Sequence, residues 1–218
     1  HLQSDHRLGM NAAELSEVVK SPQTCGAASG EYCAIWLGPE MPGDQRGDDA
    51  FSACFTSEPL QEQMDIVGAP KLQLRLSSDK PAAQIAVRLN HIHPDGAATR
   101  ITYGVLNLAH RNGHEKSEAL IPGTDIDIEL ALDQIAYRVP KGHTIRVAIS
   151  NSYWPLLWPV AEAAEITLKG GALDLPLRKS GDEDERQFLP PETAEPWRIA
   201  QLRAPENSRR HITNMETD

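Results

Sequence analysis

At its centre the sequence reads Lys71-Leu72-Gln73-Leu74-Arg75-Leu76, with leucine at every second position. The same alternation of apolar and polar residues returns in later segments, at residues 84–89, 125–132 and 144–150. Because side chains on a strand alternate between its two faces, each segment predicts a strand with an apolar row on a core and a polar row in water. The stretch from Lys71 to Tyr153 therefore predicts half-buried antiparallel strands packed as a sandwich.

The flanking sequence adds strands but no convincing helix between them. Further strands are predicted at residues 51–56, 64–67, 99–110, 166–168 and 173–177. Many short strands with turns at short intervals are typical of an all-β fold, here a jelly-roll β-sandwich over residues 25–178. The extensions on either side are predicted to be irregular. Residues 1–24 are predicted to be a linker with one short helix at residues 12–20, where Leu15, Val18 and Val19 share a face. Residues 179–218 are predicted to be a charged, proline-containing tail or the truncated start of a further segment.

Composition excludes several classes of protein. The net charge of -10 argues against a nucleic-acid partner, which requires a basic face. The N-terminal residues are polar, and no run approaches the roughly 20 apolar residues of a membrane span. We therefore expect a cytoplasmic protein with no membrane partner. The cysteines, Cys25, Cys33 and Cys54, are odd in number and lack zinc-type spacing, which favours reduced thiols over a disulfide framework.

The usual catalytic signatures are missing. The sequence contains no Gly-x-Ser-x-Gly elbow, no His-Glu-x-x-His and neither of the glycine-rich phosphate-binding motifs, so no catalytic residue and no cofactor is predicted. His91 and His93, with Asp95 two residues on, have the spacing of a metal corner. The pattern shows no third histidine beside them, so we interpret them as polar residues flanking a Pro-Asp-Gly turn and predict no metal site.

Two stretches are candidates for a functional surface. Gly43–Asp49 places three carboxylates around Arg46, whose guanidinium can fork onto a carboxylate and pin the loop. A salt-bridge network is favoured over a calcium site because the calcium-loop spacing is missing. Tyr153–Pro159 holds two tryptophans and two prolines, and either fills the core at one end of the sandwich or meets another domain or pocket. The candidate domain-interface or pocket-wall residues are Asp44, Gln45, Arg46, Tyr153, Trp154 and Trp158.

Several motifs occur together in a fixed order. They are Pro42-Gly43-Asp44-Gln45-Arg46-Gly47-Asp48-Asp49-Ala50, Ser57-Glu58-Pro59-Leu60, Gly68-Ala69-Pro70, His93-Pro94-Asp95-Gly96, Tyr103-Gly104-Val105-Leu106, His110-Arg111, Pro140-Lys141-Gly142-His143-Thr144-Ile145-Arg146-Val147 and Ser152-Tyr153-Trp154-Pro155. In this order they resemble the C-terminal domain of cocaine-esterase and X-Pro dipeptidyl-peptidase type (CocE/NonD) serine hydrolases, over residues 22–178. The resemblance implies a non-catalytic jelly roll, similar to galactose-binding domains, that packs on an α/β-hydrolase catalytic domain of the same polypeptide and helps to wall its active site.

The resemblance also implies which activity to expect of this chain and of the protein it comes from. No residue of a Ser-His-Asp triad can be assigned to a position of this sequence, so the chain alone is expected to be inactive. The parent protein is expected to be a serine hydrolase acting on acyl esters or Xaa-Pro peptides. The alternative is a carbohydrate- or small-ligand-binding module that uses exposed aromatic side chains. Homodimer formation is left open.

Overall fold

The computed structural model describes residues 1–30, 41–179, 189–190 and 192–193. The chain divides into two units, His1–Arg178 and Lys179–Asp218. The predicted tail, residues 179–218, lies almost wholly outside the described residues, as does Cys33. Among the described residues, no helix has the length and apolar character to cross a membrane.

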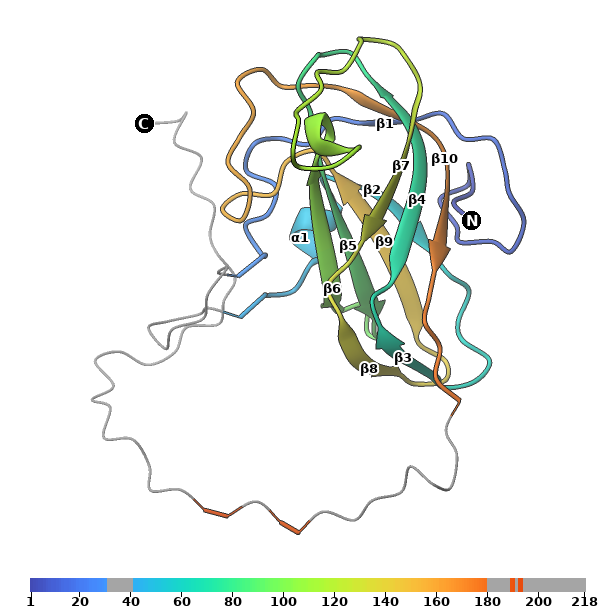
Figure 1. Ribbon diagram of the computed structural model, residues 1–218. Helices are drawn as coiled ribbons and strands as arrows, with labels where there is room; N and C mark the ends of the chain where they lie inside the picture. Colours follow the sequence, from blue (N-terminus) through green and yellow to red (C-terminus); the bar gives the residue numbers. More distant parts are fainter. Residues whose placement is uncertain (31–40, 180–188, 191, 194–218) are drawn as a thin grey trace, which may run out of the picture. The chain divides into compact units, whose positions relative to one another are not determined.

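The regular secondary structure of the first unit is almost entirely β-strand (Figure 1). In chain order its elements are β1 (Glu17–Val19), α1 (Arg46–Asp49), β2 (Ala53–Thr56), β3 (Met64–Gly68), β4 (Lys71–Ser78), β5 (Gln84–Ile92), β6 (Ala98–Asn107), the 3-10 helix η1 (Leu108–His110), β7 (Ile126–Ala131), β8 (Ile135–Val139), β9 (Thr144–Ser150) and β10 (Ile166–Asp174).

The strands form two four-stranded antiparallel sheets and a smaller pair. One sheet has the order β1-β10-β4-β7, the other has the order β2-β9-β5-β6, and β3 pairs with β8. The core lies between the two larger sheets, where the alternating leucines of β4 meet the apolar row of β5 and β9. The predicted all-β sandwich is confirmed. Two closing strands were expected at residues 166–177, but one strand, β10, covers most of this range, with an irregularity between Leu168 and Gly170.

Strand β5 differs from the prediction of a half-buried strand. Its apolar row, which includes Val87, faces the core, but its other row is buried as well, and Arg88 is 0% exposed. The second row was expected in water. Instead, α1 and the loops around it cover the outer side of the sheet, and Asn90 of β5 donates a hydrogen bond to Asp49 of α1. The alternation in β5 therefore separates an apolar core from a buried polar layer.

The predicted linker and helix at the N-terminus are wrong. Residues 17–19 form β1, which pairs with β10, with Val19 opposite Ile166. Leu15 and Val19 are buried in the core, and Leu15 N donates to Lys169 O at 3.3 Å. The edge of β10 offers both backbone partners and apolar cover, which a short isolated helix could not supply for itself. Residues 1–24 are therefore part of the sandwich unit.

Cys25 and Cys54 are free thiols beside the polar layer. Burial, with the nearby Asp49 carboxylate adding to it, raises the pKa of Cys54 to about 12. Burial likewise raises the pKa of Cys25. Only the thiolate is an effective nucleophile, so both side chains are chemically quiet at neutral pH and serve as small apolar fillers.

Candidate functional site

The charged loop at residues 43–49 splits into two separate networks. Arg46 binds Asp44 with its guanidinium fork, since Nη2 lies 2.7 Å from Oδ2 and Nε lies 3.1 Å from Oδ1. Both side chains are exposed. The predicted fork is confirmed, with Asp44 as its acceptor. Partial burial acts to raise the pKa of Asp44, but hydrogen bonds from Arg46 and Ala98 outweigh it and hold that pKa below its ordinary value.

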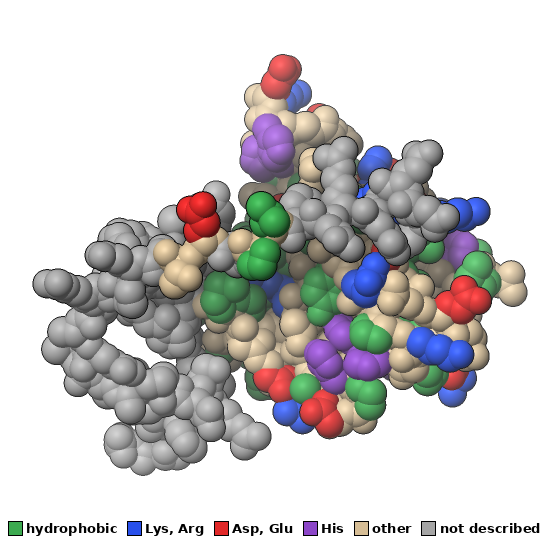
Figure 2. Space-filling model, turned by 90° about the horizontal axis from the view of Figure 1, so that it is seen from below, with side chains coloured by type: hydrophobic (Ala, Val, Ile, Leu, Met, Phe, Trp, Pro, Cys, Tyr) green, Lys and Arg blue, Asp and Glu red, His purple; other side chains and the backbone are tan. Residues whose placement is uncertain are grey.

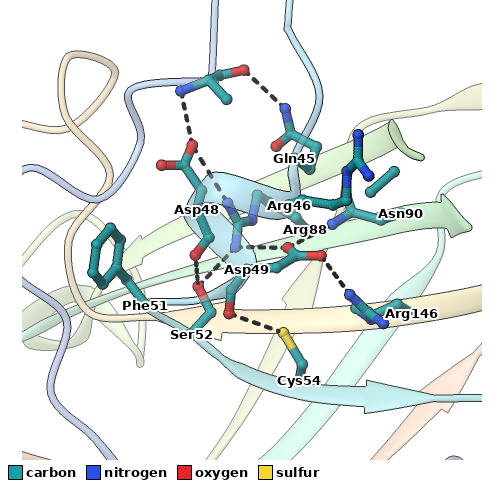
Figure 3. A network of polar contacts seen from close by, with 12 residues as sticks. Gln45, Arg46, Asp48, Asp49, Phe51, Ser52, Cys54, Arg88, Asn90 and Arg146 are labelled. Carbon is teal, nitrogen blue, oxygen red and sulfur yellow. Dashed lines mark hydrogen bonds and ion pairs between the residues drawn. The ribbon is translucent and has the colours of Figure 1, made fainter. Parts of the chain in front are cut away.

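The other two carboxylates of the loop point inward (Figure 3). Asp49 Oδ1 lies 3.1 Å from Arg88 Nη2 and accepts a hydrogen bond from Asn90 Nδ2 at 2.9 Å. Asp49 Oδ2 accepts from Arg146 Nη1 at 3.0 Å, and Asp48 Oδ2 lies 3.6 Å from Arg88 Nη1. Burial raises the pKa of Asp49, while the guanidinium groups of Arg88 and Arg146 oppose that rise. The single predicted knot is therefore an exposed pair and a buried ion network.

The buried network also fixes the loop that follows Cys25. The Asp48 carboxylate accepts hydrogen bonds from Gly26 N and Ala28 N, each at 2.9 Å. The Gln45 side chain adds a third tie, because its Nε2 donates to Ala28 O at 2.8 Å. Arg100 Nη1 donates to Ser29 O at 2.8 Å. The backbone of residues 26–29 is consequently held at Gly26, Ala28 and Ser29 by side chains from α1, the residue before it, and β6.

The aromatic stretch 153–158 is attached to the same loop. Tyr153 is fully buried, and its hydroxyl accepts a hydrogen bond from Arg100 Nη1 at 2.7 Å. Trp154 N donates to Cys25 O at 2.8 Å, and the Trp154–Pro155 peptide bond is cis. The rings of Trp154 and Trp158 meet edge to face with their centroids 5.4 Å apart. The exposed fractions are 40% for Trp154 and 80% for Trp158.

The structure thus joins the two predicted groups through one shared loop, residues 25–29. Four of the six candidates, Asp44, Arg46, Trp154 and Trp158, have exposed side chains. Gln45 and Tyr153 are 0% exposed, so neither side chain reaches an outside partner. Their contribution is to anchor the loop from inside. Sequence reasoning missed the residues that connect the groups, namely Arg88, Asn90, Arg100 and Arg146.

A cavity of about 590 Å³ lies elsewhere, over the outer face of the other sheet. It is lined by residues of β4, β7 and β10 together with His1, Ala12 and Ala13. Its polar wall comes from the water-facing rows of β4 and β7, including Arg75 and Glu129. None of the six candidate residues contributes to it.

The expectation that no third histidine accompanies His91 and His93 is wrong. His143, in the turn between β8 and β9, places its Nδ1 at 2.6 Å from His91 Nε2. Each of the three rings offers a ligand nitrogen, and these atoms lie within 4.8 Å of one another. Asp95 takes no part in the group; its Oδ1 accepts from Ala97 N and closes the Pro-Asp-Gly turn.

Comparison with known families identifies the domain. A sequence model of the X-Pro dipeptidyl-peptidase C-terminal non-catalytic domain matches residues 4–210. The chain belongs to this family. The resemblance inferred from the ordered motifs is confirmed, and the match, which begins at residue 4, includes β1.

Curated relatives of this X-Pro dipeptidyl-peptidase C-terminal domain are much longer proteins. A protein of Rhodopirellula baltica named as a Xaa-Pro dipeptidyl-peptidase is 29% identical over 107 residues, which cover 45% of this chain and 17% of the relative. A protein of Mycobacterium bovis named as a serine esterase is 24% identical over 157 residues, which cover 62% of this chain and 25% of the relative. The chain therefore matches a quarter or less of each relative.

Solved structures share the fold of this family member. An alpha-amino acid ester hydrolase superposes with a TM-score of 0.68 at 18% identity, covering 82% of this chain and 36% of that one. An aminopeptidase from a marine sediment Thaumarchaeota archaeon gives 0.68 at 18% identity, covering 80% and 35%. A CocE/NonD family hydrolase from Staphylococcus aureus gives 0.56 at 12% identity, covering 80% and 35%. In each case the matched sandwich is about a third of a longer chain.

Proposed function

We propose that this chain is the non-catalytic β-sandwich of a serine hydrolase, packs on an α/β-hydrolase catalytic domain of the same polypeptide and helps to wall its active site. The carrying observation is the exposed Trp154–Trp158 pair, whose backbone is hydrogen-bonded to Cys25 and Gln84 in a domain of this family. The parent activity that fits is hydrolysis of acyl esters or Xaa-Pro peptides, because relatives carry both names.

The tryptophan pair has the character of an interface anchor. A Trp side chain brings a large apolar area at low entropic cost, and residues that dominate binding energy are often tryptophan. Trp158 is too exposed to be core filling, which was the other interpretation of this stretch. Its backbone is held in place, since Trp158 O accepts from Gln84 Nε2 at 3.2 Å. A fixed, exposed apolar pair therefore favours a partner surface that covers it.

The Asp44–Arg46 pair supplies polar groups for the same interface. Each partner is about half exposed and already bound to the other. Interfaces commonly surround an apolar centre with a polar rim, and paired charges at a rim cost little to cover. We infer that this pair lies at the rim and Trp158 at the centre.

The first test separates the domain from the enzyme. The 218-residue chain is expected to hydrolyse neither p-nitrophenyl esters nor Xaa-Pro amides, whereas the longer polypeptide that contains it is expected to do so. A serine-reactive inhibitor should abolish the activity of the longer polypeptide. Turnover by the isolated chain that this inhibitor blocks would contradict a non-catalytic role.

The second test locates the interface with Trp158→Ala. In the isolated chain this substitution should change the free energy of unfolding by no more than about 0.5 kcal/mol, because the ring is mostly in water. In the longer polypeptide the same substitution should lower the free energy of unfolding by at least ~2 kcal/mol, because truncating a residue at the centre of an interface has an effect of that size. Urea unfolding of both proteins measures the difference.

A matched control for this test is Leu177→Ala. Leu177 is another exposed large apolar residue, 56% exposed, and lies beside Ile66 of β3. Its truncation should have the same small effect in the isolated chain and in the longer polypeptide. An equal effect of Trp158→Ala in the two proteins would place the interface elsewhere.

The carbohydrate-binding alternative rests on the same exposed pair and predicts a different result. It requires that the isolated chain release or absorb heat with at least one sugar of a panel, and that Trp154→Ala and Trp158→Ala abolish that heat. We expect no heat with any sugar, because on our proposal the pair is shaped to contact a protein surface and does not form a sugar-binding site. Binding that depends on the two tryptophans would favour the module.

A further inference from the structure

The three-histidine group is built by the pairing of β5 with β9. These strands are antiparallel, with His91 opposite Ile145 and Ile92 opposite Thr144. This register brings the end of β5 and the residue after it beside the turn that precedes β9. His91 and His143 are 52 residues apart in sequence and become neighbours only through this pairing. The group is therefore a product of the fold.

The three rings converge closely. His91 and His93 stack with their centroids 4.0 Å apart, and the centroids of His91 and His143 are 4.8 Å apart. His91 is buried, whereas His93 and His143 are half-buried, so solvent reaches the group. Figure 2 shows histidine side chains gathered into one group on the face seen from below.

Metal ions bind histidine as a neutral imidazole, through the lone pair of one ring nitrogen. In His91 the two ring nitrogens meet different partners, since Nδ1 lies 2.9 Å from Tyr137 Oη and Nε2 lies 2.6 Å from His143 Nδ1.

Two of the rings are already oriented by hydroxyl groups. His91 Nδ1 lies 2.9 Å from Tyr137 Oη, and His93 Nε2 lies 3.0 Å from Thr99 Oγ1. Histidine ligands of metals usually donate their other ring N–H to such an acceptor, which fixes the ring and its tautomer. This arrangement leaves His91 Nε2 and the Nδ1 of His93 as the ligand atoms, and His91 Nε2 is the nitrogen that faces His143.

We propose that His91, His93 and His143 form a binding site for a divalent transition-metal ion, with Zn²⁺ as the preferred ion. Three imidazoles suit zinc, and a three-histidine set leaves a fourth position for water or another ligand. Two nitrogens bound to one tetrahedral zinc at ~2.1 Å are roughly 3.4 Å apart. The 2.6 Å between His91 and His143 must therefore open by about an ångström, which the half-buried ring of His143 in its turn allows.

The test is a calorimetric titration of the 218-residue chain with Zn²⁺, repeated with Co²⁺, whose visible absorption reports tetrahedral coordination. We expect one ion per chain, and His143→Ala should weaken binding by at least ~100-fold. Tyr137→Phe keeps the ring but removes the acceptor for His91, and should weaken binding by about 10–100-fold. Zn²⁺ should also raise the unfolding temperature of the unaltered chain and not that of His143→Ala.

The controls separate this site from other histidines. His110 and His114 form a second pair with ring centroids 5.5 Å apart, so the variant with both replaced by alanine should bind Zn²⁺ as the unaltered chain does. His1→Ala removes the chelate that an N-terminal histidine makes with its own amine, and should also leave binding unchanged.

The fold is expected to survive the key substitution. The backbone hydrogen bonds of His143, to Pro140 O and from Leu60 N, remain in His143→Ala, and circular dichroism checks the fold before titration. His93→Gln provides a second ligand variant at a half-buried position. Absence of Zn²⁺ binding at micromolar concentration, or binding that neither His143→Ala nor His93→Gln weakens, would overturn the proposal.

Discussion

Replacing Arg88 by methionine is expected to lower the free energy of unfolding by about 3–5 kcal/mol. Arg88 is fully buried and lies within ion-pair distance of Asp48 and Asp49, which are buried as well. Methionine occupies a similar volume but leaves the two carboxylates short of a positive charge in a place that water does not reach. Removing one partner of a buried ion pair is far more costly than the net gain of forming the pair. Urea unfolding followed by circular dichroism measures the loss.

Two controls define what the Arg88 result means. Lys71→Met removes one partner of an exposed pair, in which Lys71 Nζ lies 3.1 Å from Glu129, and should leave stability nearly unchanged because water screens that pair. Arg88→Lys keeps the charge but loses the guanidinium fork. Its free energy of unfolding should lie between that of the unaltered chain and that of Arg88→Met. A loss from Arg88→Met no larger than that from Lys71→Met would show that the network contributes nothing to stability.

Replacing Gly26 by alanine is expected to cost about 2–5 kcal/mol, the sum of a strained backbone and an overpacked contact. Gly26 has a φ of +111°, which residues with a side chain rarely adopt. A Cβ at this position would lie 2.6 Å from Trp154 N and closer still to Trp154 O. These are backbone atoms, so a whole segment would have to move. We expect a changed fluorescence spectrum from the exposed tryptophan pair together with the loss of stability.

The other glycines allow the two causes to be separated. Gly96 has a φ of +86° and open space around it, so Gly96→Ala should show the backbone cost alone, about 1–2 kcal/mol, with an unchanged spectrum. Gly47, in α1, has neither a positive φ nor a neighbour within 4 Å, so Gly47→Ala should be neutral or stabilising. If Gly26→Ala matches Gly96→Ala in both readouts, the close packing of the loop on Trp154 is not what limits this position.

Alternation was sufficient to predict the strands whose outer row stays in water. β7, and β4 as far as Leu76, follow the pattern residue by residue. β8 carries the same signal at Ile135, Tyr137 and Val139, but the run is short and was not singled out. β1 was mistaken for a helix because Leu15 and Val19 are four residues apart, a spacing that fits a helical face as well as a strand flanked by irregular chain.

What covers a strand cannot be read from the strand itself. The sequence around Arg88 alternates like that of β4, yet α1 buries the polar row of one strand and not of the other. The same limit applies to His143, whose place beside His91 depends on the register of β9 on β5. The ion pair between Arg46 and Asp44 was predictable because the two residues are only two positions apart in sequence. The inward orientation of Asp48 and Asp49 was not, because it depends on Arg88 of β5.

The pairing of β1 with β10 has a consequence for how the chain folds during synthesis. Glu17–Val19 finds its partner only at residues 166–168, and β2 finds its partner only in β9. Such non-local pairings slow folding, because β1 and β2 have open edges until β10 and β9, respectively, have left the ribosome. An open edge is a template for association with other chains. A nascent chain that stops short of β10 therefore leaves β1 without its partner and the edge of β4 that β10 covers open to association.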